Sequence, residues 1–430
     1  MELLGLSLLL LALLALNVPI AFALLGASAV GLFVFQGGLG GIYQMPLQGY
    51  SIGREFVLVA IPLFILMAQV LSAGGVGRDL FDIASKWLRH FPGGLGIATI
   101  GATAIFSAIS GAAVAAAATM SLVAIPEMLK RGYPKRLTLG LVAVASGLDI
   151  LIPPSIPLIL YGALADESVG KLYIGGLGPG ILWAGMYAGY LAYLAARGKI
   201  QVVEQPATWR ERFESTRNGF WGLFIPVLVI GGIYSGIFTP TEAAAVGVVI
   251  AYLVVVLVYR SQSLTDLVNV TMDALKGSIM LYAVIVGATV FGYLLNILHV
   301  PQDVTAWVAS MNVHPIVVIY IINLLLIILG MFLDVASIIL ITVPILYPVI
   351  TSLGFDGVWF GVLFVANMNL AVVTPPVGLC LYVVQGVTKE PLDEVVRGVL
   401  PFYSLMVLGL ILMVHFPQII LFLPDLMGPR

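Results

Sequence analysis

Two proline pairs interrupt long apolar segments of this sequence. Pro153–Pro154 lies in the run LIPPSIP, and Pro375–Pro376 lies in the run VTPPVG. Proline lacks the backbone N–H and its ring collides with the preceding helical turn, so each pair must break its helix. Inside a membrane, broken backbone is tolerated only where it is buried in protein or lines a wet cavity. Helices broken at corresponding points of two repeats are typical of the binding site of secondary transporters.

The composition places those segments in a membrane. Hydrophobic residues make up 61% of the 430 residues and charged residues 9%. Several runs without Asp, Glu, Lys or Arg exceed the roughly 18 residues that indicate a membrane span; they include 3–53, 90–126, 172–196, 277–302, 304–333, 357–388 and 398–424. We therefore predict an all-α polytopic membrane protein with no sizeable soluble domain.

Several other classes of function are disfavoured. The net charge of −2 gives no indication of nucleic-acid binding, and no phosphate-binding loop of an ATPase is present. The four histidines are scattered and Cys380 is the single cysteine, so we expect neither an enzyme nor a His/Cys metal site, and no cofactor beyond a coupling ion.

Landmarks repeat along the chain at one offset. Position 375 minus position 153 is 222, and the same offset matches Gly132 with Gly354. Such a constant offset indicates an internal duplication. We predict repeat one at 1–197, a cytoplasmic connector at 198–217 and repeat two at 218–430.

Basic residues orient the two repeats. The segments 73–90 and 128–136 contain seven Lys and Arg residues, whereas their counterparts 297–312 and 350–358 contain none. Basic loops stay in the cytoplasm, so equivalent loops should lie on opposite sides and the repeats should be inverted. Because the connector is also basic, the trace places both termini on the outer, periplasmic side.

Two segments are too short for two crossings each. Residues 92–129 and 314–350 begin and end on one side in this trace, yet two crossings need about 40 residues and a turn. We expect re-entrant hairpins with tips near 107–111 and 330–334, while two short crossing helices remain the alternative. The broken helices are expected at about 137–163 and 357–387.

Polar residues at the predicted tips and breaks are candidate ligands. Asp149 and Asp334 are carboxylates inside apolar stretches, where an ionisable group is a functional hypothesis by default. A structural hydrogen bond is the alternative for Asp149, and a helix cap is the alternative for Asp334. Thr239 and Glu242 instead have the spacing of a capping box, which favours a structural role.

An ordered set of motifs then resembles one family, the large membrane subunit of tripartite ATP-independent periplasmic (TRAP) transporters. The motifs are IPLF from Ile61, SG from Ser110, IPPSIP from Ile152, GGLGPG from Gly175, TPTEAA from Thr239, GMFLD from Gly330, TPPVGL from Thr374 and LPF from Leu400. The resemblance implies an elevator-type, Na⁺-coupled symporter in the bacterial inner membrane. It also implies three partners: a small four-helix membrane subunit, a periplasmic binding protein and an organic acid anion.

The resemblance also implies site residues. Sodium site one would comprise Ser107, Ser110, Gly147, Asp149 and Pro153, and sodium site two Gly330, Asp334, Thr374 and Pro375. The substrate would lie between them, at Pro154, Ser155, Asp334, Thr374 and Pro376. Two features depart from the family pattern: tip one continues with alanines from Ala112 where more serines are usual, and Asp149 replaces a small neutral residue.

Two rival functions remain open at this point. A stand-alone ion-coupled anion permease or antiporter of similar inverted architecture would need no binding protein. An intramembrane enzyme would need a pair of close aspartates, for which Asp149 and Asp334 are the only candidates, and neither lies in an intramembrane-protease signature.

Overall fold

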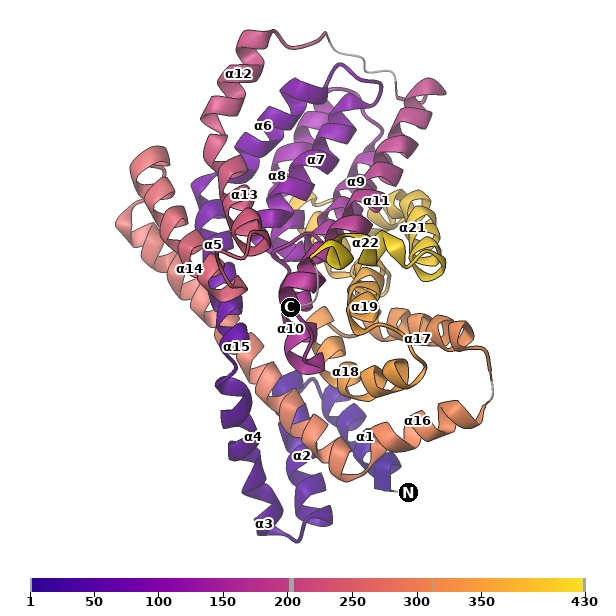
Figure 1. Ribbon diagram of the computed structural model, residues 1–430. Helices are drawn as coiled ribbons and strands as arrows, with labels where there is room; N and C mark the ends of the chain where they lie inside the picture. Colours follow the sequence, from indigo (N-terminus) through magenta and orange to yellow (C-terminus); the bar gives the residue numbers. More distant parts are fainter. Residues whose placement is uncertain (1, 201–204, 312, 428–430) are drawn as a thin grey trace.

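The chain folds into helices (Figure 1). The structure, a computed structural model, describes residues 2–200, 205–311 and 313–427, and these contain no strand. The α-helices are α1 (Glu2–Ala15), α2 (Ile20–Phe35), α3 (Leu39–Ile42), α4 (Gln44–Gly53), α5 (Ala60–Gly74), α6 (Val76–Leu88), α7 (Gly94–Ser110), α8 (Ala113–Lys130), α9 (Lys135–Ser146), α10 (Ile156–Ala165), α11 (Val169–Ala196), α12 (Trp209–Asn218), α13 (Phe220–Tyr234), α14 (Pro240–Leu253), α15 (Leu264–Ile297), α16 (Val300–Ser310), α17 (Pro315–Gly330), α18 (Val335–Ser352), α19 (Gly357–Ala371), α20 (Leu379–Thr388), α21 (Leu392–His415) and α22 (Gln418–Leu426). Three short elements join them: 3₁₀ turns η1 (Phe56–Val59) and η2 (Gly147–Ile150), and the π-helical η3 (Val254–Tyr259).

Helix length and composition fit a membrane protein. Among the described residues, six helices are long and apolar enough to span a bilayer, or seven if the pair α12–α13, bent by 60°, forms one span. The six are Phe56–Gly74, Ala113–Lys130, Pro240–Tyr259, Leu264–Ile297, Val335–Ser352 and Leu392–His415. Large apolar side chains such as Phe22, Ile181 and Ile279 are exposed on helix surfaces, as expected where lipid replaces water.

Two pairs of elements have matching lengths. The helices α7 and α8, with 17 and 18 residues, pack against each other, and so do α17 and α18, with 16 and 18 residues. Each pair is followed by a helix that stops and resumes: α9 with η2 and then α10, and α19 and then α20. The interruptions cover 151–155 and 372–378, which contain the two proline pairs, and both Pro–Pro bonds are cis.

Local chemistry explains where these helices end. Gly111 has φ +59, a left-handed conformation that ends α7 and favours glycine. At the other tip, Asp334 is the N-cap of α18, because its side chain accepts a hydrogen bond from the N–H of Ser337 at 3.1 Å. The helix cap expected for Asp334 is therefore present, while its role as a ligand stays a prediction.

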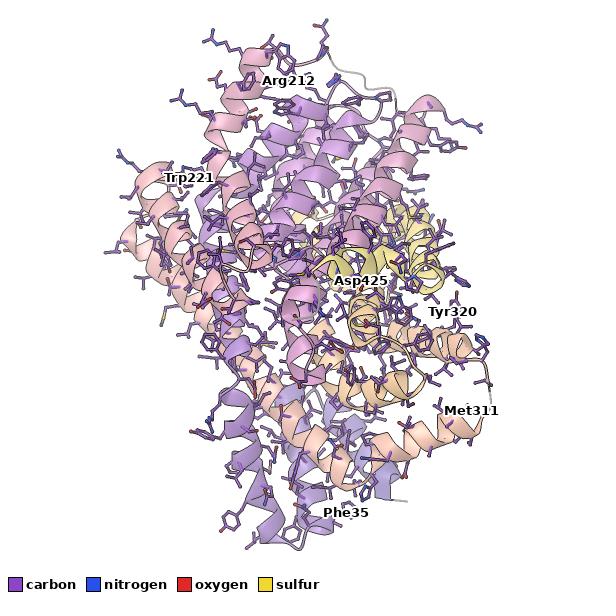
Figure 2. All side chains as sticks on the ribbon, viewed as in Figure 1. Phe35, Arg212, Trp221, Met311, Tyr320 and Asp425 are labelled. Atoms are coloured by element: carbon purple, nitrogen blue, oxygen red, sulfur yellow. The ribbon has the colours of Figure 1, made fainter. Side chains whose placement is uncertain are left out.

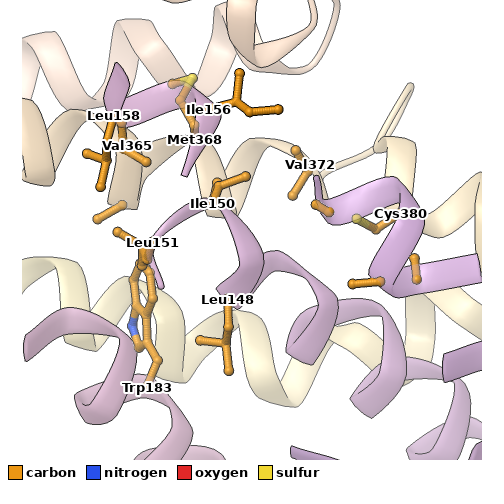
Figure 3. Close-up of a cluster of buried hydrophobic side chains, with 14 of the residues drawn as sticks. Leu148, Ile150, Leu151, Ile156, Leu158, Trp183, Val365, Met368, Val372 and Cys380 are labelled. Atoms are coloured by element: carbon orange, nitrogen blue, oxygen red, sulfur yellow. The ribbon is translucent and has the colours of Figure 1, made fainter. Parts of the chain in front are cut away.

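The two halves of the sequence interlock. The helix α9 packs along α21, and α11 packs against α19, so each broken helix rests on a helix from the other half. At the first crossing, a Cβ on Gly140 would overlap backbone atoms of Gly398. The apolar core continues around the first break, where Leu148, Leu151 and Trp183 belong to the same buried cluster as Val365 and Met368 of α19 (Figure 3).

A long tilted helix flanks this core. The 34 residues of α15 span roughly 51 Å at 1.5 Å per residue, more than a hydrocarbon core of about 30 Å. It packs on α5 and α2 and reaches α18 (Figure 1). The helix α12 carries Arg212 at the end of the molecule opposite Phe35 (Figure 2), so the described part of the basic connector lies at one extremity.

Candidate functional site

The tip between α7 and α8 contacts the first helix break through a carboxylate. The hydroxyl of Ser110 donates a hydrogen bond to Oδ2 of Asp149 at 2.7 Å, and both residues are buried. The backbone groups of Gly111 and Ala112 face the same carboxylate. Its second oxygen, Oδ1, has no hydrogen-bond partner among the described residues. A buried carboxylate oxygen without a partner is costly, so the arrangement is suited to a bound cation or proton.

Backbone also meets backbone at this tip. The carbonyl oxygen of Pro154 lies 2.8 Å from where a Cβ on Gly111 would stand, so only glycine allows this approach. The hydroxyl of Ser155 donates to the carbonyl of Ile150 at 2.5 Å and accepts from the N–H of Leu158 at 3.3 Å. Ser155 thereby joins the two halves of the broken helix.

Ser107 and Pro153 also belong to predicted sodium site one, and each has a different local environment. The hydroxyl of Ser107 donates to the carbonyl of Thr103 at 2.8 Å, while its own carbonyl accepts from Gly111 at 3.2 Å. Pro153 is buried in the break. The structure thus brings Ser110, Asp149 and the Pro154 carbonyl together around tip one.

Gly147 contacts the other half of the chain. A Cβ on Gly147 would overlap Oδ1 of Asn369, which lies near the end of α19. Asn369 is fully buried, and neither Oδ1 nor Nδ2 has a hydrogen-bond partner among the described residues. A second buried asparagine lies on the same helix: Nδ2 of Asn367 donates to Oδ1 of Asn323, in α17, at 2.8 Å. An amide with no partner at such a depth is a further candidate ligand.

The second tip and the second break are more open. The N–H of Val377 donates to the carbonyl of Met331 at 3.3 Å, which joins the break to the tip. A Cβ on Gly330 would overlap the Cβ of Ala371. Thr374 donates its hydroxyl to the carbonyl of Leu370 at 2.6 Å.

The first and second breaks differ in solvent exposure. Pro375, Pro376 and Asp334 are exposed, in contrast to the buried first break around Pro154. Ser337 donates its hydroxyl to Oδ1 of Asp334, so both carboxylate oxygens at tip two have partners.

The donor set determines which ions could be held. Within the described ranges, no three His, Cys, Asp or Glu side chains lie close enough to bind a metal ion. What converges instead at tip one is carboxylate, hydroxyl and backbone carbonyl oxygen, the donors that unwound transporter helices offer to Na⁺.

A series of cavities leads away from tip one. The first, about 340 Å³, lies between the tip, α5 and α15, and its lining includes Ser110, Gln69 and Ser72. The second, about 500 Å³, shares Ser72 and Ala73 with the first and extends to Arg78. A third, about 310 Å³, is lined by Arg78 and Arg131. Neighbouring cavities share lining residues, and together they extend from tip one to Arg78 and Arg131.

Another cavity borders tip two. It measures about 560 Å³ and is lined by Phe332, Leu333 and Asp334 together with Asn17 at the α1–α2 turn. Asp334 therefore faces an open space, although its carboxylate also caps α18.

Sequence reasoning missed some polar residues of these regions. Asn369 was not selected, although 369 minus 147 is 222, the offset of the proline pairs. Applying that offset to every candidate ligand would have identified it. Gln69 and Ser72 line the first cavity from α5, where no local motif distinguishes them from packing residues.

Comparison with known proteins gives a consistent family. The family model described as "Tripartite ATP-independent periplasmic transporter, DctM component" matches residues 7–419. The chain is 37% identical to the C4-dicarboxylate TRAP transporter large permease protein DctM of Pseudomonas aeruginosa, covering 90% of each chain. It is 36% identical to the protein of that name from Rhodobacter capsulatus, covering 98% of each. It is also 34% identical to the ectoine TRAP transporter large permease protein TeaC of Halomonas elongata, covering 96% of this chain and 97% of the relative.

A solved structure has a similar fold. The crystal structure of the Alcanivorax borkumensis YdaH transporter, described as having an unusual topology, superposes with a TM-score of 0.67. The match covers 95% of this chain and 98% of that one at 14% identity, so it concerns the fold alone.

Proposed function

Because the chain belongs to the DctM family of TRAP transporter large permeases, a family of bacterial multi-span membrane transport proteins and not of enzymes, we propose that it imports an organic acid anion by Na⁺-coupled symport. The anion is delivered by a periplasmic binding protein, and a small four-helix membrane subunit completes the permease. The printed names of the relatives, C4-dicarboxylate above all, favour a small carboxylate.

The contact between tip one and break one carries this proposal. Ser110 and Asp149 place a hydroxyl and a carboxylate beside the unwound backbone at Pro154, and Oδ1 of Asp149 is unpartnered among the described residues. An oxygen-rich, buried and negatively charged position is what a coupling Na⁺ requires. Site one would therefore use Ser107, Ser110, Gly147, Asp149 and Pro153.

The proposal also includes a second sodium site and a position for the substrate anion. Site two would use Gly330, Asp334, Thr374 and Pro375 at the other tip and break. The anion would lie between the two sites, near Pro154, Ser155 and Pro376, where the half-helix α10 directs its N-terminus toward the break.

The inverted-repeat architecture is part of the proposal. Gly147 and Asn369 are related by the 222-residue offset and touch each other. Residues related by a two-fold axis meet each other where they lie on that axis, so this contact supports a pseudo-two-fold relation between the halves. The pairs α7–α8 and α17–α18 would then be re-entrant hairpins that enter from the cytoplasm and from the periplasm.

An elevator mechanism follows from this arrangement. Hairpins and broken helices would move as one body against a scaffold that includes α5 and α15. The cavities from Ser110 to Arg131 would form the cytoplasmic exit of an inward-facing state. The trace places both ends of the chain in the periplasm, although residues 1 and 428–430 lie outside the described residues, as do 201–204 of the connector.

Reconstitution separates this proposal from a stand-alone permease. Proteoliposomes containing the permease and its small subunit should accumulate a C4-dicarboxylate only when the binding protein is supplied. The permease without the small subunit should be inactive. Equal uptake with the permease alone would contradict the tripartite function.

A further inference from the structure

The two tips each have one carboxylate, but it comes from a different element in each half. Asp334 stands at the tip itself, as the N-cap of α18. The matching N-cap of α8 is Ala112, because 334 minus 112 is 222, and Ala112 makes no side-chain capping hydrogen bond. Tip one therefore lacks a carboxylate of its own.

The missing carboxylate is supplied by the broken helix. Oδ2 of Asp149 accepts a hydrogen bond from Ser110, and the carboxylate faces the backbone of Gly111 and Ala112. The position that matches Asp149 at the same offset is Ala371. The two aspartates and the two alanines thus occupy crossed positions in the two halves.

Both break positions lie close to the last residue of the first hairpin helix, although the contacts differ in kind. Asp149 touches Ser110, the last residue of α7, and Ala371 meets Gly330, the last residue of α17. A side chain at either break position therefore reaches the end of the first hairpin helix. Because this proximity is shared, a carboxylate can reach the same space either from the tip or from the break.

We propose that Asp149 and Asp334 are equivalent carboxylates, each providing the single negative charge with which its tip and break hold one monovalent cation. In the first half the carboxylate stands at position 149, and position 112 is alanine. The inference rests on the proposed Na⁺ coupling and adds that the charge can stand at either position. The unpartnered, buried Oδ1 of Asp149 is the oxygen left for the cation.

The N-cap geometry makes it feasible to place the charge at position 112. Ala112 has φ −143 and ψ 107, in the same extended region as Asp334 with φ −74 and ψ 158. An aspartate at position 112 could therefore cap α8 as Asp334 caps α18. Ala112 is only half-buried, so the added side chain has room.

The test uses ion-dependent stability and requires no transport. The unfolding midpoint of the whole chain in lipid nanodiscs is measured in NaCl and in KCl of equal ionic strength, because an ion that binds only the folded protein raises the midpoint. Wild type should be stabilised by Na⁺, and Asp149→Ala should lose about half of that shift because one of two sites is gone. The double variant Asp149→Ala/Ala112→Asp should recover most of it.

A neutral variant is the matched control. Asp149→Ala/Ala112→Asn keeps a capping side chain at position 112 without the charge and should not recover the Na⁺ shift. If Asp149→Ala does not fold, the Na⁺ shifts of the two double variants still test the inference, because these variants differ only in the charge at position 112. Equal Na⁺ shifts in the two double variants would overturn only the inference that the charge can stand at position 112. A wild type without any Na⁺ shift would overturn the proposed Na⁺ coupling on which that inference rests.

Discussion

Ser110 and Asp149 are joined by a 2.7 Å hydrogen bond between the first hairpin tip and the first helix break, and both side chains are buried. The bond fixes one carboxylate oxygen and leaves the other without a partner among the described residues. The backbone of Gly111 and Ala112 also faces this carboxylate, and its unpartnered oxygen is the one that we assign to the cation. At tip two both oxygens of Asp334 accept hydrogen bonds from Ser337, so a cation there would share oxygens that already have partners.

Removing the charge at position 149 should weaken Na⁺ dependence. Asp149→Asn keeps the shape of the side chain, so we expect normal folding but at least a tenfold higher Na⁺ concentration for half-maximal uptake, equivalent to about 1.4 kcal/mol. Asp149→Ala should have a larger effect. The measurement is initial uptake against Na⁺ concentration at two pH values.

Two results would contradict a Na⁺-binding role for Asp149. A variant that lost only its pH dependence would indicate a proton site. A variant with unchanged responses to Na⁺ and to pH would show that Asp149 serves only as a hydrogen-bond acceptor for Ser110.

Inverted topology can be tested with single cysteines. Lys130 and Ser352 are the exposed last residues of α8 and α18 and are separated by the 222-residue offset. They are preferable to Gly132 and Gly354, whose φ values of +81 and +82 disfavour other residues. In a Cys380→Ala background, a membrane-impermeant maleimide added to intact cells should label Ser352→Cys and leave Lys130→Cys unlabelled until the membrane is permeabilised. Labelling of both positions from one side would exclude inversion.

The contact between Gly147 and Asn369 should limit what either position accepts. Gly147→Ala would place a methyl group on the Asn369 amide, at a cost of about 1–3 kcal/mol of stability. The double variant Gly147→Ala/Asn369→Ala should lose clearly less than the sum of the single changes, because the clash is removed.

Gly185→Ala provides the control for a methyl group added elsewhere. Gly185 lies within α11 with no atom near its Cβ position, so this variant should be neutral. Unfolding midpoints of the wild type, the two single variants, the double variant and this control give the comparison, and strictly additive losses would show that the two residues do not meet.

Helix breaks and helix caps could be predicted from the sequence because they depend on local chemistry. The helix breaks at the two proline pairs follow from missing N–H groups, and the capping box of Thr239 and Glu242 was predicted from spacing alone and is present at the start of α14. Asp334 was open to two readings; its helix cap is present, and its role as a ligand stays a prediction. These features depend on residues only a few positions apart.

Contacts between the two halves of the chain could not be predicted from local sequence patterns. Asn369 meets Gly147, and α9 crosses α21 at Gly140 and Gly398, because two distant segments pack together. No periodicity within one segment specifies its partner in an all-apolar environment, where lipid and protein faces have similar composition. The same limit applies to the Ser110–Asp149 hydrogen bond: both residues were predicted as candidates, but their pairing was not.

Na⁺ coupling is the central claim, and a gradient experiment tests it most directly. Proteoliposomes with the permease, small subunit and binding protein are loaded without Na⁺, and the membrane potential is held at zero while radiolabelled C4-dicarboxylate and ²²Na⁺ are followed. We predict accumulation above the external concentration only under an inward Na⁺ gradient, with ²²Na⁺ entry that depends on the substrate. Equal accumulation when K⁺ or a pH gradient replaces Na⁺, or substrate entry without ²²Na⁺, would contradict the account.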